Sequence, residues 1–316
     1  MAEIRSVRHL PAEGASTAHG AAGMPWRALL VVADGDRAVQ AEAVALEAFG
    51  IDRREALGHA LAWASLDLEA RRQHLSLPGL LARSLGRDAT HPTVAVSALL
   101  FGNDLPSLAA SARDAAEAGH RTFKLKVGNP GDARRPEDAV VGETTARVSA
   151  VREVLPAQAR LRLDANQAWT CAQLRAITAA LAPFRDSIDW LEDPCLPEVP
   201  WQAVLDAGTL PLAPDERCRE PEAILPWLGH ARMAAVVLKP SLWGPERSLG
   251  IAAEAHRHRL PVIASSAYEG DAGLALVAAF AAAAGSPGIP HGLVLGTRSA
   301  GPVLHVPRGL PEATGC

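Results

Sequence analysis

The stretch TFKLKV, residues 122–127, is followed by the turn-rich sequence GNPGD and has the alternating pattern of a short strand. Successive side chains of a strand point to opposite faces, so Lys124 and Lys126 are expected to share one face. The apolar residues around them share the other face. Two neighbouring ammonium groups repel each other, although a lysine pair is common on a solvated sheet face. The stretch therefore predicts a strand, and the rest of the chain decides whether its lysines serve a reaction.

Short apolar runs closed by turn residues recur along the chain after residue 92. There are eight of them, at residues 93–100, 122–127, 160–165, 188–192, 210–213, 235–239, 262–265 and 293–295. Helical patterns lie between these runs, at residues 107–118, 145–154, 172–181, 221–228, 246–257 and 273–284. Strands that alternate with helices predict a parallel α/β barrel. The last run is short and little helix follows it, so we expect the final unit of the barrel to be incomplete.

The first 92 residues have a different pattern. ALLVVADGDRAVQAEAVAL contains a D-G turn between two apolar runs, which is typical of a β-hairpin. RREALGHALAWASLDLEARRQ, residues 53–73, has the apolar spacing of an amphipathic helix. PAEGASTAHGAAG, residues 11–23, has no periodicity, and we expect a mobile loop there. The pattern predicts a small α+β domain over residues 1–92.

Composition and charge exclude several classes of protein. The chain has 316 residues and is 48% hydrophobic, which supports a sizeable core. A net charge of −4 and a pI of about 6.3 leave no basic surface for nucleic acid or an anionic membrane. The longest apolar run, residues 273–285, is shorter than the ~20 residues of a membrane span. The beginning MAEIRSVRHL lacks the pattern of a signal peptide, so we expect a cytoplasmic protein.

Charged residues stand at or just after the ends of five consecutive predicted strands. In chain order they are Lys126, Asp164, Glu192, Asp215 and Lys239. From Asp164 onward they are 28, 23 and 24 residues apart, about one strand–helix unit each, whereas the first step is 38 residues and contains the polar insertion NPGDARRPEDAVVGE. Ser265 and Ser266 follow the next strand. Barrel enzymes build their sites at these strand ends, so we expect the charged residues to form a ring.

Each charged residue also has a purely structural interpretation, for example as a helix cap in the case of Asp164 or Asp215. Their joint placement favours chemistry, because three buried carboxylates would need a cation. Carboxylate oxygens favour Mg²⁺ over Zn²⁺. Crowded positive charge favours a neutral amine, so Lys124 and Lys126 beside a metal suggest a base with a lowered pKa. Such a base would remove a proton alpha to a metal-bound carboxylate.

At these residues the chain resembles the enolase superfamily, in its muconate-lactonizing subgroup. The resemblance rests on K-x-K, D-A-N, E-D-P, D-E and L-K-P on successive strands. RLDANQAWT, WLEDPC with Cys195 and the insertion after KVG are most similar to the o-succinylbenzoate synthase family. The resemblance implies a modified TIM barrel, (β/α)7β, over residues 93–299. It also implies an N-terminal α+β capping domain over residues 1–92, which the C-terminal tail 300–316 joins and whose loop 11–23 closes over the substrate.

The resemblance also implies roles for individual residues. Mg²⁺, with Mn²⁺ as a substitute, would be bound by Asp164, Glu192 and Asp215. Lys126 would remove the alpha proton and return it to the departing hydroxyl, with Lys124 as its partner and Lys239 steadying the charge from the opposite side. The expected substrate contacts and neighbours of the metal ligands are Asn166, Glu216, Ser265 and Ser266. Trp169, Trp190 and Trp201 are expected to be packing residues.

The expected activity is a carbon–oxygen lyase reaction on a small-molecule carboxylate. It would dehydrate 2-succinyl-6-hydroxy-2,4-cyclohexadiene-1-carboxylate to o-succinylbenzoate in menaquinone biosynthesis. Racemisation of N-succinylamino acids, dipeptide epimerisation, muconate cycloisomerisation and a barrel that only binds remain alternatives, and so do a monomer and a homo-oligomer. The D-x-D pair common in dipeptide epimerases is absent from residues 267–269, and Gly270 and Asp271 stand where relatives more often carry Ser or Thr.

Overall fold

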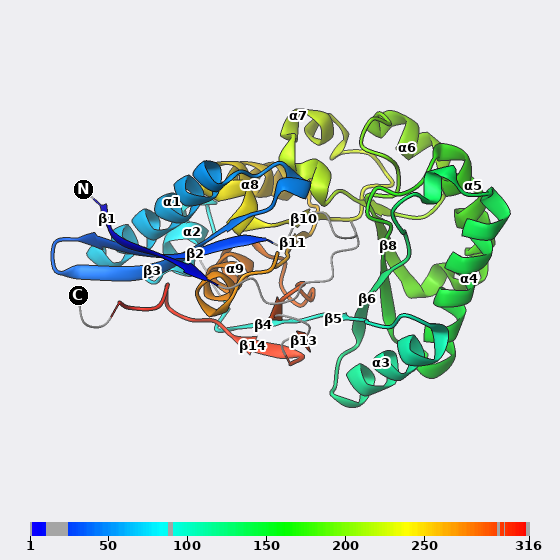
Figure 1. Cartoon of the computed structure of the whole chain (residues 1–316), viewed down its shortest axis with the longest axis horizontal. Helices are drawn as coiled ribbons and strands as arrows, with labels where there is room; N and C mark the ends of the chain where they lie inside the picture. The colour runs from blue at the N-terminus through cyan, green and yellow to red at the C-terminus, as the bar shows by residue number, and fades with distance from the viewer. Residues whose placement is uncertain (1, 11–24, 88–90, 296–297, 300, 314–316) are drawn as a thin grey trace.

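The computed structural model describes residues 2–10, 25–87, 91–295, 298–299 and 301–313. The predicted loop 11–23 lies outside the described residues. An N-terminal antiparallel sheet with two helices lies at one end of the molecule, and an α/β barrel forms the rest (Figure 1). The chain therefore has the modified TIM-barrel fold with a small N-terminal capping region.

The N-terminal sheet has three antiparallel strands in the order β1-β2-β3. They are β1 (Glu3–Leu10), β2 (Trp26–Asp34) and β3 (Arg37–Ala45). The predicted D-G hairpin is confirmed, with Gly35 at φ 62° in the turn between β2 and β3. A short 3₁₀ turn, η1 (Glu47–Phe49), then leads to helices α1 (Arg53–Arg72) and α2 (Leu77–Ser84). The α1 helix starts where predicted because the side chain of Asp52 accepts from the backbone N–H of Glu55.

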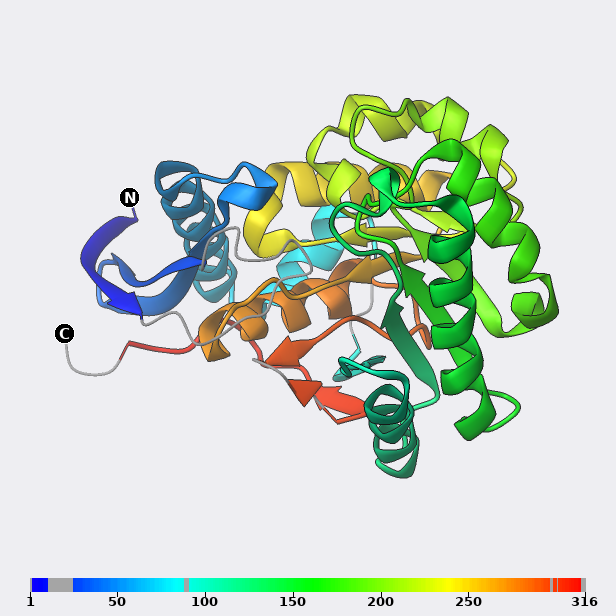
Figure 2. The ribbon, with the colours of Figure 1, turned by 45° about the vertical axis from the view of Figure 1, so that its right-hand side comes forward.

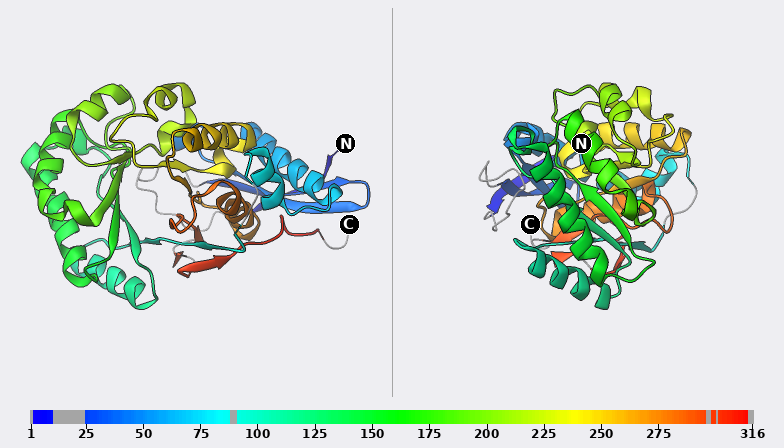
Figure 3. Two further views of the ribbon diagram at one scale, coloured as in Figure 1. Left: turned by 180° about the vertical axis from the view of Figure 1, so that it is seen from behind. Right: turned by 90° about the vertical axis from the view of Figure 1, so that its right-hand side faces the viewer.

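The barrel begins with a continuous parallel sheet of five strands. In order they are β5 (Ala98–Leu99), β6 (Thr122–Lys126), β7 (Arg160–Asp164), β8 (Ile188–Glu192) and β9 (Leu212–Ala213). A parallel pair follows, β10 (Val236–Leu238) and β11 (Val262–Ala264). The helices that follow the strands are α3 (Leu105–Glu117), α4 (Glu137–Val154), α5 (Cys171–Ala180), α6 (Trp201–Ala207), α7 (Pro221–Ile224), α8 (Pro240–Arg257) and α9 (Asp271–Ala284). Helices α3 to α6 cover the outer side of the strands (Figures 2 and 3).

The barrel closes through a very short eighth segment. His291 donates its backbone N–H to Ala95 O and its carbonyl accepts from Ser97 N, while Gly292 donates to Ala264 O. His291 and Gly292 thus link the first strand segment of the barrel to β11. The short strand β12 (Val294–Leu295) follows and pairs with β13 (Arg298–Ser299). The predicted weak final unit is thus confirmed.

Two predicted helices differ in detail from the observed ones, and one observed helix was not predicted. The α4 helix begins at Glu137, eight residues before the predicted start, and only a 3₁₀ turn, η2 (Asp132–Arg134), precedes it. In the sequence, the acidic residues of its first turn look like part of a polar insertion. Acidic residues also stabilise the N-terminus of a helix, and in the structure they stand in the first turn of α4. The α6 helix was not predicted, and the predicted helix 221–228 is one α-turn followed by η5 (Leu225–Trp227). Two further 3₁₀ turns are η3 (Ala182–Ser187) and η4 (Glu216–Arg219).

The end of the chain runs back along the N-terminal region. Strand β14 (Val303–His305) pairs with β4 (Thr93–Ala95). Farther along, Gln40 N donates to Pro311 O and Leu77 N donates to Arg308 O. The N-terminal helix α1 also packs against the barrel, since Trp63 Nε1 donates to Pro240 O at 2.9 Å. The division at residue 92 stays a prediction. No helix in the described ranges combines the length and the apolar character required to cross a membrane.

Candidate active site

Strand register places the predicted charged residues at one end of the barrel. Lys126 lies opposite Asp164, and Asp164 lies opposite Glu192 in the parallel sheet. Asp215 follows the end of β9, and Lys239 follows the end of β10. The structure therefore brings together at the carboxyl ends of five strands the ring of side chains that the strand spacing predicts.

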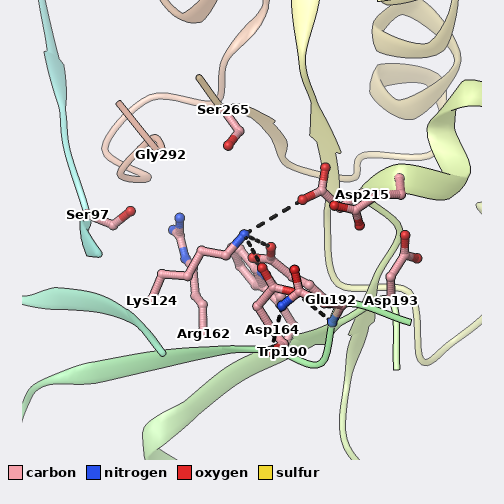
Figure 4. A network of polar contacts seen from close by, with 12 residues as sticks. Ser97, Lys124, Arg162, Asp164, Trp190, Glu192, Asp193, Asp215, Ser265 and Gly292 are labelled. Carbon is pink, nitrogen blue, oxygen red and sulfur yellow. Dashed lines mark hydrogen bonds and ion pairs between the residues drawn. The ribbon is translucent and has the colours of Figure 1, made fainter. Parts of the chain in front are cut away.

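The three carboxylates of Asp164, Glu192 and Asp215 form a buried cluster, here called the triad. One oxygen from each lies within 4.8 Å of the others, and all three residues are at most 2% exposed. Lys124 reaches into the triad (Figure 4), with its Nζ 2.8 Å from Asp164 Oδ2, 2.5 Å from Glu192 Oε2 and 3.7 Å from Asp215 Oδ2. The triad thus carries more negative charge than this one ammonium neutralises.

The donor set of the triad fits a hard divalent cation. All three ligands are carboxylates, the ligand type that Mg²⁺ prefers in proteins. Asp215 Oδ2 is buried, and no hydrogen-bond donor in the described ranges reaches it. A buried carboxylate oxygen without a donor is costly, so this atom is suited to a metal ligand. Burial, together with Glu216, raises the pKa of Asp215 to about 7.

The two lysines of β6 have opposite pKa shifts. Burial lowers the pKa of Lys126, and the ammonium groups of Lys124 and Lys239 lower it further, against the opposing effect of Asp164. Burial also acts on Lys124, but the three triad carboxylates raise its pKa well above the ordinary value. The expected direction therefore holds for Lys126, with burial as the main cause. Lys124 therefore stays an ammonium beside Lys126, because carboxylates surround it.

Lys239 approaches the triad from the other side of the barrel. Its Nζ forms ion pairs with Asp215 Oδ1 and, at 3.1 Å, with Glu216 Oε1. Burial opposes its charge, but these two carboxylates raise its pKa above the ordinary value. The ring centroid of Phe49, from the N-terminal region, lies 5.3 Å from the same Nζ. Lys239 is therefore held as an ammonium between two carboxylates and an aromatic ring.

The predicted neighbours of the metal ligands also lie at this site. The backbone N–H of Asn166 donates to Asp164 Oδ1 at 3.0 Å, and Asn166 has a φ of 47°. This contact fixes one oxygen of Asp164 and leaves the other for Lys124. Glu216 accepts from Lys239, and its second oxygen, Oε2, is buried without a hydrogen-bond partner in the described ranges.

A cavity of about 390 Å³ opens above the triad. Several of its lining residues were predicted from the sequence, whereas Phe49, Phe101, Arg147 and Tyr268 were not. Arg147 is on α4 and donates from Nε to Lys126 O at 3.2 Å, which no local pattern indicates. Phe101 lies two residues after the end of β5 and is 43% exposed, an unusual exposure for a large apolar side chain. The cavity therefore combines cations near the triad with apolar side chains at its rim.

The two predicted serines differ in their contacts, although both line the cavity. Ser266 Oγ accepts from Val294 N at 2.9 Å and donates to Val294 O at 3.0 Å. Within the described part of the chain, the one hydrogen bond of Ser265 Oγ is a long contact of 3.4 Å to Ser266 O. Ser266 therefore holds the closing segment of the barrel, and Ser265 is the serine whose hydroxyl remains more available to a ligand.

A carboxylate from the N-terminal region fixes the loop after β11. Glu42, on β3, accepts from Gly270 N at 2.9 and 2.8 Å and from Gly273 N at 3.2 Å. A Cβ at position 270 would lie 2.4 Å from Arg27, the ion-pair partner of Glu42. A side chain at this position would therefore push the Arg27 guanidinium away from its present place beside Glu42. The same loop holds Tyr268 at φ 69°, a strained conformation for a large residue.

A family model described as enolase C-terminal domain-like matches residues 107–304, which carry the whole triad and all three lysines. The chain belongs to this family. This match confirms the predicted superfamily. Similar solved structures support the fold.

Named relatives within the enolase superfamily are o-succinylbenzoate synthases. The chain is 32% identical to that of Mycolicibacterium smegmatis over 240 residues, which is 75% of this chain and 65% of the relative. It is 35% identical to that of Mycobacterium tuberculosis over 181 residues, which is 57% of this chain and 50% of the relative. The chain thus matches between half and just under two thirds of the length of these relatives.

Solved structures of this superfamily match nearly the whole chain. The L-Ala-D/L-Glu epimerase of Bacillus subtilis has a TM-score of 0.80 at 18% identity and covers 99% of both chains. A dipeptide epimerase of Enterococcus faecalis, solved with Mg and a dipeptide, has a TM-score of 0.76 at 20% identity and covers 98% of this chain and 97% of its own. At such low identity these likenesses show the fold alone.

Proposed function

We propose that this protein dehydrates 2-succinyl-6-hydroxy-2,4-cyclohexadiene-1-carboxylate to o-succinylbenzoate, as a magnesium-dependent lyase of menaquinone biosynthesis. The observation that carries the proposal is the placement of Lys126, at the end of β6, and Lys239, just after β10, at either side of one carboxylate triad. The names of the sequence relatives support the choice of reaction. The cationic lining of the cavity supports an anionic substrate.

The triad would hold the metal ion. When bound, Mg²⁺ would draw electron density from a substrate carboxylate and make the proton alpha to it more acidic. Arg147 and Lys124, which also line the cavity, would attract the anionic substrate and orient it. The apolar rim at Phe101 would exclude water from the ring of the substrate.

Proton transfer would depend on Lys126. Its neutral amine accepts the alpha proton, and the negative charge that develops on the substrate carboxylate is stabilised by the ammonium of Lys239. The ammonium of Lys126 then gives the proton to the departing hydroxyl. One C–H bond and one C–O bond break, one water leaves, and the product ring becomes aromatic.

A second candidate is the racemisation of N-succinylamino acids or the epimerisation of dipeptides. It is favoured by the same opposed lysines, since a two-base reaction needs a base on each face of the substrate. It is disfavoured by Lys239, which contacts both Asp215 and Glu216 and so is placed as a charged group. The absence of a D-x-D pair from residues 267–269 also disfavours a dipeptide substrate.

The test is turnover by the purified protein. Loss of the cyclohexadiene absorbance should be fast with Mg²⁺ and should stop with EDTA. In parallel, N-succinylamino acids and dipeptides should be incubated in D₂O and examined by NMR for exchange of the alpha proton. Exchange into one of these compounds without any loss of the cyclohexadiene would contradict the proposal and favour the second candidate.

A further inference from the structure

Trp190 makes a contact with the triad that packing alone does not require. It lies on β8 two residues before Glu192, so the two side chains share the face that points into the barrel. Its Nε1 donates to Glu192 Oε1 at 2.9 Å (Figure 4). The other oxygen, Oε2, contacts Lys124 Nζ at 2.5 Å. The indole N–H thus holds one oxygen of Glu192 while the second faces the centre of the triad.

The indole ring is itself held in place. It is 5% exposed and packs in a small cluster inside the barrel with Ala213, Ala235, Val237 and Ile263. The guanidinium carbon of Arg162 lies 4.2 Å from the ring centroid, and Arg162 Nη1 donates to Pro290 O at 2.6 Å. The cation over its face and the apolar wall around it leave the ring few alternative orientations.

The other buried tryptophans of the described chain make no such contact. The indole nitrogens of Trp169, Trp201 and Trp243 have no hydrogen-bond partner in the described ranges. Trp63 donates to a backbone carbonyl. Among these side chains, Trp190 alone donates to a carboxylate. Buried indole N–H groups in the described part of this chain do not in general have a hydrogen-bond acceptor, so the bond from Trp190 to Glu192 needs its own explanation.

We propose that Trp190 is a positioning residue of the metal site. Its N–H fixes which oxygen of Glu192 faces the metal, and the stacked Arg162 fixes the indole. The inference rests on the metal role proposed above for Glu192. Hydrogen bonds to metal ligands from outer residues typically contribute 10- to 100-fold to metal affinity, and we expect an effect of that size here.

The test is Mn²⁺ and Mg²⁺ binding by calorimetry to Trp190→Phe, with folding checked by circular dichroism. We expect the dissociation constant to rise about 10- to 100-fold. Trp201→Phe is the matched control, because that indole also lies near an arginine, Arg217 at 5.4 Å, but has no acceptor. Metal addition should change the tryptophan fluorescence of the wild type and of Trp201→Phe, and this change should be lost in Trp190→Phe.

A second variant covers the case in which Trp190→Phe fails to fold. β-(3-Benzothienyl)alanine at position 190 keeps the shape of the indole and replaces only its N–H with sulfur, so it should show the same loss of affinity. Binding within threefold of the wild type in either folded variant would overturn the inference. If instead Glu192→Gln binds Mn²⁺ as tightly as the wild type, the proposed metal site itself is wrong. These two failures are therefore distinguishable.

Discussion

The two halves of the barrel differ in regularity and in what they carry. Strands β5 to β9 form one continuous parallel sheet, whereas β10 and β11 form a separate pair and the closing segment at His291 is joined to its neighbours by single bridges. The regular half supplies the triad, Lys124 and Lys126. The irregular half supplies Lys239 and the loop with Tyr268. The groups proposed to hold the metal and to move the proton thus lie on or just after strands of the continuous sheet, and the wall proposed to contact the substrate lies on the less regular half.

Within the irregular half, the largest effect is expected from Lys239, the charge that it contributes to the described lining of the cavity. Lys239→Ala should lower turnover of the cyclohexadiene by on the order of 10²- to 10³-fold, because a fixed cation near the developing charge is lost. Lys239→Arg keeps the charge and should retain measurable dehydration. Steady-state kinetics on both variants measures the effect.

The same two variants also test whether Lys239 acts as a fixed charge or as a base. Arginine does not act as a base, so Lys239→Arg should abolish any racemisation that uses Lys239 on the second face. Loss of dehydration in Lys239→Arg as complete as in Lys239→Ala would show that a neutral amine is needed there. Lys239 would then belong to the proton-transfer machinery.

Acid should weaken the closing segment of the barrel. Burial, with a smaller contribution from Arg162, lowers the pKa of His291 to about 3, and its Nδ1 accepts from Ala264 N at 3.0 Å. In the unfolded chain His291 takes up a proton near pH 6.5, whereas in the folded chain it stays neutral down to about pH 3. Its contribution to the free energy of unfolding is therefore complete above pH 6.5 and is lost as the pH drops toward 3. Between pH 7.5 and pH 5 the free energy of unfolding should fall by about 2 kcal/mol from this residue.

Urea unfolding at several pH values measures this dependence. His291→Asn keeps an acceptor for Ala264 N and does not titrate, so its pH dependence over this range should be flatter than that of the wild type. Parallel curves for the two proteins would contradict the assignment of the acid sensitivity to His291.

The smallest effects are expected from substitution of the two serines of the irregular half, which have different contacts. Ser266→Ala removes both contacts to Val294 and should lower the free energy of unfolding by about 1 kcal/mol. Ser265→Ala is the control and should leave stability unchanged while it raises KM. The opposite outcome, with KM changed only by Ser266→Ala, would make Ser266 the substrate contact.

The regular half could be predicted from the sequence because its geometry is local. Residues two apart share a strand face, and one strand–helix unit separates Asp164, Glu192 and Asp215. Both rules apply within about 30 residues along the chain. They therefore place the triad without knowledge of any distant contact.

The rest depends on contacts between distant segments. The ion pair of Lys124 with Glu192 spans 68 residues. Against burial, Asp164, Glu192 and Asp215 raise the pKa of Lys124, and no local sequence pattern indicates that shift. Glu42 accepts from Gly270 N across 228 residues, so this anchor of the loop after β11 was not visible in the sequence. The contact of Trp190 was missed for another reason, since a buried indole two residues before a carboxylate is usually a packing residue.

Single-turnover formation of o-succinylbenzoate by Lys126→Ala and the wild type tests the central claim most directly. Because Lys126 is proposed as both base and acid, the variant should react at least about 10³-fold more slowly, with the binding of Mg²⁺ and product retained. Product formation within tenfold of the wild-type rate would contradict the account, since the proton would then be taken by another group.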